Sequence, residues 1–180
     1  MMILLVIVIL VLLVLTGILV YAATKADQYL VERSIQIDAA PEQIFPLIND
    51  LHAMNRWNPF LLRDPGIQGY YNDITAGVGA SYSFDGSKDI GAGHMSITKS
   101  KPFSQVDMSL VMLKPFPGAN EISFYLHPEA DSTQVSWHMR GKAPYIMKVM
   151  SLFFNMDAVV GKAFEQGLAD LKKRVEQQPG

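Results

Sequence analysis

Five side chains in predicted strands or helices are candidate acids, bases or carbonyl polarisers: Tyr82, Asp107, Arg140, Asp157 and Glu165. Asp107 alternates with apolar neighbours along a predicted strand and should face solvent. Asp157 borders the apolar stripe of a predicted helix and could project toward a pocket mouth. No positioned partner can be assigned to any of them, and a solvated or capping carboxylate is the simpler interpretation. We therefore predict no catalytic residue.

Other catalytic and cofactor patterns point the same way. The sequence has no cysteine, no Gly-x-Ser-x-Gly elbow, and four histidines that form no HExxH cluster. Gly91-x-Gly93 is not followed by the helix that a phosphate cradle needs. His94 and His138 fall on outward strand faces. We expect no metal, no cofactor and no nucleotide.

Charge argues against a nucleic-acid partner. The net charge is -2, and Lys and Arg are scattered along the 180 residues. Phosphate backbones are bound by concentrated basic patches, so DNA and RNA are not expected ligands.

The first 23 residues carry no charge, and Ile3 to Leu15 is an unbroken aliphatic run. A helix of about 20 such residues spans roughly 30 Å, the thickness of a bilayer's apolar core. We predict a transmembrane anchor over residues 1–23, in a single-pass protein of the bacterial cytoplasmic membrane. A cleaved signal peptide ending near Val20-Tyr21-Ala22 is the main alternative, and a buried soluble helix is another.

The side of the membrane on which the domain lies is open. Lys25 and Arg33 follow the segment and favour a cytoplasmic domain by the positive-inside rule. Bacterial signal anchors commonly place the next domain outside. Two charges do not decide between them.

A linker over residues 24–28 precedes one domain over residues 29–177. Val31 to Ile37 predicts a strand, Pro41 opens a helix, with Pro46 in its first turn, and Asn49 to Pro59 holds a second short helix. Alternating runs separated by turn residues then predict six antiparallel strands, near 68–72, 80–85, 90–99, 105–113, 120–127 and 133–141. Residues 146–177 predict one long amphipathic helix, with Phe153, Met156 and Val160 in its apolar stripe. The class is α+β.

Alternation also predicts which strand residues face the long helix. In the last strand, Val135, Trp137 and Met139 share a face opposite Ser136 and His138. The same count places Tyr82 with Phe84, Met95 with Ile97, Met108 with Leu110 and Met112, and Phe124 with Ile122. Such faces line either an apolar pocket or a filled core, and alternation alone does not distinguish these.

Several segments resemble the polyketide cyclase/dehydrase and lipid transport family of the START-like (SRPBCC) superfamily. They are Val31 to Phe45, Asn49-Asp50-Leu51, Arg56-Trp57-Asn58-Pro59, Gly77 to Tyr82, Pro115 to Gly118 and Met156 to Leu171. The resemblance runs from about Tyr29 to Val175. It implies the helix-grip fold, in which a seven-stranded curved antiparallel sheet wraps a long C-terminal helix around an apolar cavity.

The resemblance implies a site for a hydrophobic or lipid-like molecule, held by a membrane-tethered domain. We expect the ligand-binding residues to be Trp57, Phe60, Tyr82, Phe84, Met95, Met108, Phe124, Trp137, Met139, Met156, Val160 and Phe164. The Trp57 to Phe60 loop could gate the cavity and meet lipid, or simply pack a corner of the fold. A cyclase or dehydratase using the same cavity, and a scaffold with a filled core, remain alternatives. Fold alone does not assign an activity, and non-catalytic binding is favoured.

Overall fold

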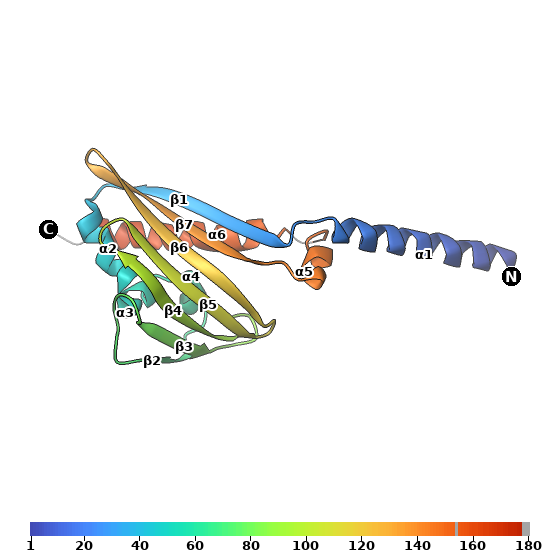
Figure 1. The fold of residues 1–180 in the computed structure, drawn as a ribbon, viewed down its shortest axis with the longest axis horizontal. Helices are drawn as coiled ribbons and strands as arrows, with labels where there is room; N and C mark the ends of the chain where they lie inside the picture. Colours follow the sequence, from blue (N-terminus) through green and yellow to red (C-terminus); the bar gives the residue numbers. More distant parts are fainter. Residues whose placement is uncertain (154, 178–180) are drawn as a thin grey trace.

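The computed structural model describes residues 1–153 and 155–177, and the main chain but not the side chain of Met156. An N-terminal helix leads into a strand, three short helices, six strands and two further helices (Figure 1). The elements are α1 (Met2–Ala23), β1 (Gln28–Ile37), α2 (Pro41–Asn49), α3 (Leu51–Asn55), α4 (Pro59–Leu62), β2 (Gln68–Tyr71), β3 (Ser81–Asp85), β4 (Ala92–Lys101), β5 (Gln105–Lys114), β6 (Gly118–Glu129), β7 (Ser132–Lys142), α5 (Tyr145–Met150) and α6 (Met156–Glu176).

The seven strands form one antiparallel sheet in the order β1-β7-β6-β5-β4-β3-β2. β1 therefore closes the meander by pairing with the last strand, from Gln28 opposite Lys142 to Ile37 opposite Thr133. The predicted α+β class and seven-stranded sheet are confirmed. The strands β1, β4 and β6 extend a few residues beyond their predicted ends, because cross-strand pairing continues into polar sequence that carries no alternation signal.

The sheet buries one face against α6, which runs behind β1 and β7 in Figure 1. In β7, Val135 and Trp137 are buried as the alternation predicts, but Ser136 on the opposite face is buried too, and Met139 and His138 are both partly buried. The core also takes in Ile44 and Ile48 of α2 and Leu171 of α6. This places one apolar layer between the sheet and the helix.

The prediction of a single helix over residues 146–177 is wrong. The segment forms α5 and α6, separated by residues 151–155. Asn155 caps α6, because its side-chain oxygen accepts a hydrogen bond of 3.0 Å from the amide of Ala158. Phe153 lies in the break and is 67% exposed, so it does not belong to the apolar stripe. The apolar residues keep their helical spacing across the break, so the sequence pattern gives no sign that Asn155 caps a new helix.

The helices between β1 and β2 also differ in detail from the prediction. Pro46 lies in the second turn of α2, and the helix ends soon after it, at Asn49. A short helix, α4, follows α3 and was not predicted. It begins at Pro59 and is capped by Asn58, whose side chain accepts a hydrogen bond of 3.1 Å from the Phe60 amide.

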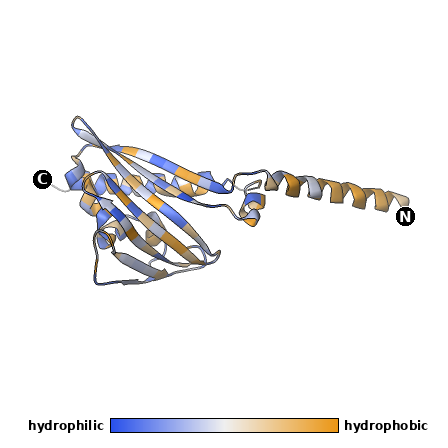
Figure 2. Ribbon diagram, viewed as in Figure 1, coloured by the Kyte–Doolittle hydropathy of each residue, from blue (hydrophilic) through white to orange (hydrophobic). Residues whose placement is uncertain are grey.

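The helix α1 projects away from the domain (Figure 1), and most of its residues are hydrophobic (Figure 2). It is long and apolar enough to cross a membrane, and none of its most apolar stretch is buried in the protein. Four residues, Thr24 to Asp27, connect it to β1. The helix α5 lies beside its last turns, where the Tyr145 hydroxyl donates a hydrogen bond of 2.8 Å to the carbonyl oxygen of Leu19.

Candidate functional site

A cavity of about 330 Å³ lies between the sheet and α6, and we call it the inner cavity. Its volume is at the small end of the range of ligand pockets in proteins. Its walls come from α3 and α4, strands β3 to β7, the loop before β4, and α6. The lining residues are Met54, Asn58, Phe60, Leu61, Tyr82, Phe84, Asp89, Ile90, Met95, Leu110, Met112, Pro115, Asn120, Ile122, Trp137, Met139, Val160 and Phe164.

Most of the residues predicted to bind a ligand lie in this wall. They are Phe60, Tyr82, Phe84, Met95, Trp137, Met139, Val160 and Phe164. Trp57, Met108 and Phe124 do not line the inner cavity; they are fully buried in the surrounding core. The side chain of Met156 lies outside the described part of the structure.

Trp57 packs inside the core and does not form a gate to the inner cavity. Its side chain is fully buried, and its indole Nε1 donates a hydrogen bond of 2.9 Å to the carbonyl oxygen of Leu47. Its ring meets Trp137 edge-on, with the ring centroids 5.7 Å apart. Of the two roles considered for the loop, Trp57 itself takes the packing one, and within this loop Asn58 and Phe60 reach the inner cavity.

The aromatic side of the wall depends on a glycine. The ring of Trp137 stacks on that of Phe164, with centroids 4.1 Å apart and planes 6° from parallel. A Cβ atom at Gly167 would lie 2.9 Å from Cζ3 of Trp137 and 2.8 Å from Cδ of Pro59. The missing side chain at position 167 thus lets α6 approach the sheet closely enough for this stack.

Few polar groups enter the inner cavity. Asn120 contributes its amide, whose oxygen accepts a hydrogen bond of 2.7 Å from the Tyr29 hydroxyl. The titratable groups in its described lining are Tyr82, whose pKa is raised mainly by burial, and Asp89, which is exposed. The Nε1 of Trp137 is buried without a hydrogen-bond partner in the described part of the chain. The cavity therefore suits an apolar molecule with at most a few polar atoms.

Sequence reasoning missed part of this wall. Leu110, Met112 and Ile122 had been assigned to the inward face by alternation and could have been included. Residues from loops and short helices, such as Leu61 and Ile90, carry no periodic signal. Only the closure of the sheet around α6 brings them to the cavity.

Of the acid and base candidates, Tyr82 lines the inner cavity, whereas Asp157 and Glu165 lie outside its lining. The Arg33 guanidinium binds both Asp157 and Glu165, with Nη2 3.1 Å from Oδ2 of Asp157 and Nε 2.8 Å from Oε1 of Glu165. The guanidinium lowers the pKa of the Asp157 carboxyl. The expectation that Asp157 points to a pocket mouth is wrong. Its carboxylate joins α6 to β1 through Arg33, a pairing that the sequence does not predict.

The other polar candidates have surface partners. Asp107 lies near Lys99, with 3.8 Å between Oδ2 and Nζ, and His138 lies 3.4 Å from the Glu32 carboxylate. His94 is exposed, so both histidines avoid the buried face of the sheet. No group of three or more His, Asp or Glu side chains among the described residues is arranged to hold a metal ion.

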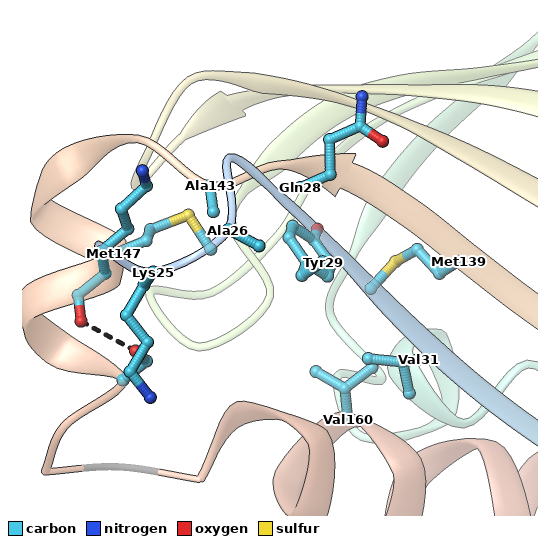
Figure 3. Close-up of a pocket in the computed structure, with 11 residues that line it drawn as sticks. Lys25, Ala26, Gln28, Tyr29, Val31, Met139, Ala143, Met147 and Val160 are labelled. Atoms are coloured by element: carbon cyan, nitrogen blue, oxygen red, sulfur yellow. Dashed lines mark hydrogen bonds between the residues drawn. The ribbon is translucent and has the colours of Figure 1, made fainter. Parts of the chain in front are cut away.

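A second cavity, of about 210 Å³, lies where α1 joins the domain, and we call it the lateral cavity (Figure 3). It is lined by Lys25, Ala26, Gln28, Tyr29, Val31, Met139, Ala143, Met147, Lys148, Ser151 and Val160. In Figure 3, Val160 projects from α6 toward Val31 and Met139. Met139 and Val160 also line the inner cavity, so the two cavities meet at these side chains.

Solved structures of several bacterial proteins share this fold. Protein MLL2253 from Mesorhizobium loti has a TM-score of 0.61 and 15% identity, and the match covers 85% of this chain and 99% of that one. The Aha1 dimer from Colwellia psychrerythraea has a TM-score of 0.58 and 19% identity, over 84% and 99% of the two chains. CalU16 from Micromonospora echinospora has a TM-score of 0.53 and 17% identity, over 85% and 88%. At these identities the likeness concerns the fold.

No curated protein matches the chain by sequence. The family model described as "Polyketide cyclase / dehydrase and lipid transport" matches residues 28–176, which span β1 to the last turn of α6. The sheet, the terminal helix and the cavity between them are those expected from the resemblance in the sequence. The chain therefore belongs to the polyketide cyclase/dehydrase and lipid transport family, whose fold is a ligand-binding one.

Proposed function

We propose that the domain binds a hydrophobic, lipid-like molecule in the inner cavity without reacting with it, while α1 anchors the domain in a membrane. The observation that carries the proposal is the inner cavity itself, about 330 Å³ enclosed mainly by aromatic, aliphatic and methionine side chains. Thioethers such as those of Met95 and Met112 adapt to irregular apolar contents, which favours a flexible ligand.

The lining supports binding over acid–base chemistry. Its titratable groups are a tyrosine with a raised pKa and an exposed carboxylate, and neither has a positioned partner in the wall. General acid–base catalysis requires a group that exchanges protons near working pH within hydrogen-bond reach of the substrate. Binding by shape and apolar contact makes no such demand.

The anchor supports a ligand drawn from the membrane. The surface of α1 is almost entirely exposed aliphatic side chains, which are stable in hydrocarbon and not in water. Tethering raises the local concentration of the cavity near bilayer components.

The test uses the full chain in lipid nanodiscs and cis-parinaric acid, a fluorescent fatty acid that accepts energy from tryptophan. Trp137 in the cavity wall acts as the donor. Leu110→Phe should fill part of the cavity and lower the apparent affinity at least about tenfold, equal to about 1.4 kcal/mol. Val111→Phe, on the next, outward-facing residue of β5, should bind like the wild type. Absence of saturable uptake by the wild type, or equal affinities of the two variants, would contradict the proposal.

A further inference from the structure

The lateral cavity lies at the base of the anchor. Its lining includes Lys25 and Ala26, which directly follow α1, and Met147 and Lys148 of α5. The helix α5 is held against α1 by the hydrogen bond from the Tyr145 hydroxyl to Leu19. With α1 in a bilayer, this cavity is therefore the part of the domain next to the lipid surface.

Two apolar side chains on and just after α5, the helix that contributes Met147 to the lateral cavity, are exposed. Ile146 of α5 is 59% exposed, and Phe153 in the turn after α5 is also mostly exposed. Exposed apolar side chains beside a membrane-spanning helix are stabilised by insertion into the interface between headgroups and acyl chains. The domain thus presents exposed apolar side chains beside α1, on the helix that also lines the lateral cavity.

Charge at the lateral cavity favours an acidic headgroup. Lys25 and Lys148 both line it, and its described lining contains no carboxylate. The Lys148 ammonium pairs with Asp27, which lies outside the lining, and this contact lowers the pKa of the Asp27 carboxyl. An apolar chain entering here can leave an acidic group beside the ammonium of Lys25.

The side chains of Met139 and Val160 lie at the boundary between the lateral cavity and the inner cavity. Met139 and Val160 line both, and beside them the Tyr29 hydroxyl of the lateral cavity binds Asn120 of the inner cavity. A methionine side chain has three rotatable bonds, and a valine is small. Rotation of Met139 would join the two spaces without moving the backbone.

From these contacts we infer that the lateral cavity is a portal. Through it, the chain of an acidic single-chain lipid passes from the bilayer, past Met139 and Val160, into the inner cavity. The inference rests on the proposed binding function and adds the route and the class of ligand. The competing route is the rim of the inner cavity at Asp89 and Pro115, both exposed.

The test measures the rate at which the full chain in vesicles of phosphatidylethanolamine and phosphatidylglycerol takes up cis-parinaric acid from the same vesicles. Ala143→Phe narrows the portal alone, since Ala143 lines only the lateral cavity, and should slow uptake at least about tenfold. Its final occupancy should match the wild type, because a narrowed route changes rates and not affinity. Ala119→Phe is the matched control, because Ala119 is an exposed residue of β6 that lines neither the lateral nor the inner cavity, and it should leave the rate unchanged.

The possible outcomes are distinct. A wild-type rate for Ala143→Phe, or equally slow uptake by Ala143→Phe and Ala119→Phe, would overturn the portal while binding still stands. Wild-type protein that takes up no probe would remove the binding function, and the portal with it. If Ala143→Phe does not fold, Met147→Phe narrows the same space from α5 and carries the same expectation.

Discussion

Gly161 of α6 lies directly against the guanidinium of Arg33 in β1. A Cβ atom at position 161 would be only 1.9 Å from Nη2 of Arg33. The glycine therefore makes room for the arginine that binds Asp157 and Glu165, one helical turn to either side. Arg33 lies on the inward face of the edge strand β1, and its charge is paired in this way with carboxylates on the surface of α6.

This relationship predicts that one substitution has opposite effects in two backgrounds. In the wild type, Gly161→Ala should displace Arg33 and lower the free energy of unfolding by about 1 kcal/mol. In an Arg33→Ala background the clash is gone, and the same change should raise stability by about 1 kcal/mol through helix propensity. Urea unfolding of the full chain in a non-ionic detergent, followed by tryptophan fluorescence, measures both. If Gly161→Ala changed the free energy of unfolding in the same direction in both backgrounds, the contact between Gly161 and Arg33 would be contradicted.

Acid should weaken the same ion pair. Arg33 lowers the pKa of Asp157 below its ordinary value of 3.8, so the charged carboxylate stabilises the folded state above that value. This stabilisation is lost as the pH falls through the lowered pKa. Between about pH 5 and pH 2, the wild type should lose more unfolding free energy than Asp157→Asn. Asp131→Asn, at an exposed turn, should follow the wild type; parallel curves for all three proteins would rule the contribution out.

A buried hydroxyl joins β7 to the connection between β1 and α2. Thr133 is fully buried, and its Oγ1 donates a hydrogen bond of 2.7 Å to the carbonyl oxygen of Ala39. Thr133→Val keeps the shape and leaves that carbonyl unpaired, so we expect a loss of about 1–3 kcal/mol. Thr98→Val removes an exposed hydrogen bond of 3.2 Å and should cost less than about 0.5 kcal/mol. Similar losses in both variants would show that burial does not set the cost.

Phe124 tests whether the core beside the inner cavity is tightly packed. It is fully buried between Trp57 and Trp137, with its ring centroid 4.9 Å from that of Trp137. Phe124→Ala should destabilise the domain by about 3–5 kcal/mol in urea unfolding. Phe116→Ala, at an exposed turn, should change stability by no more than about 0.5 kcal/mol. A small effect at Phe124 would mean that this region is as open as the inner cavity.

Local sequence was sufficient for the sheet. Alternation assigned Val135 and Trp137 to the buried face, and turn residues separated the strands correctly. It was insufficient where periodicity continued through a structural break. The apolar spacing of Phe153 and Val160 suggested one helix, whereas the cap at Asn155 starts a new one.

The candidate site was predictable where it is built from strands and α6. Tyr82, Trp137 and Phe164 follow from the inward pattern together with the family resemblance. The difference between Met95, which lines the inner cavity, and Met108, which is buried in solid core, depends on where the curved sheet leaves space. The ion pairs of Arg33 could not be predicted, because its carboxylate partners lie more than a hundred residues away in the chain.

The short connection between α1 and β1 sets how far the domain can move away from α1. Four extended residues reach at most about 14 Å. The hydrogen bond from Tyr145 to Leu19 holds the domain still closer to α1. A protein that carries a lipid between two membranes needs either a longer linker or no membrane anchor. With α1 in a bilayer as proposed, the domain could reach only the leaflet next to it.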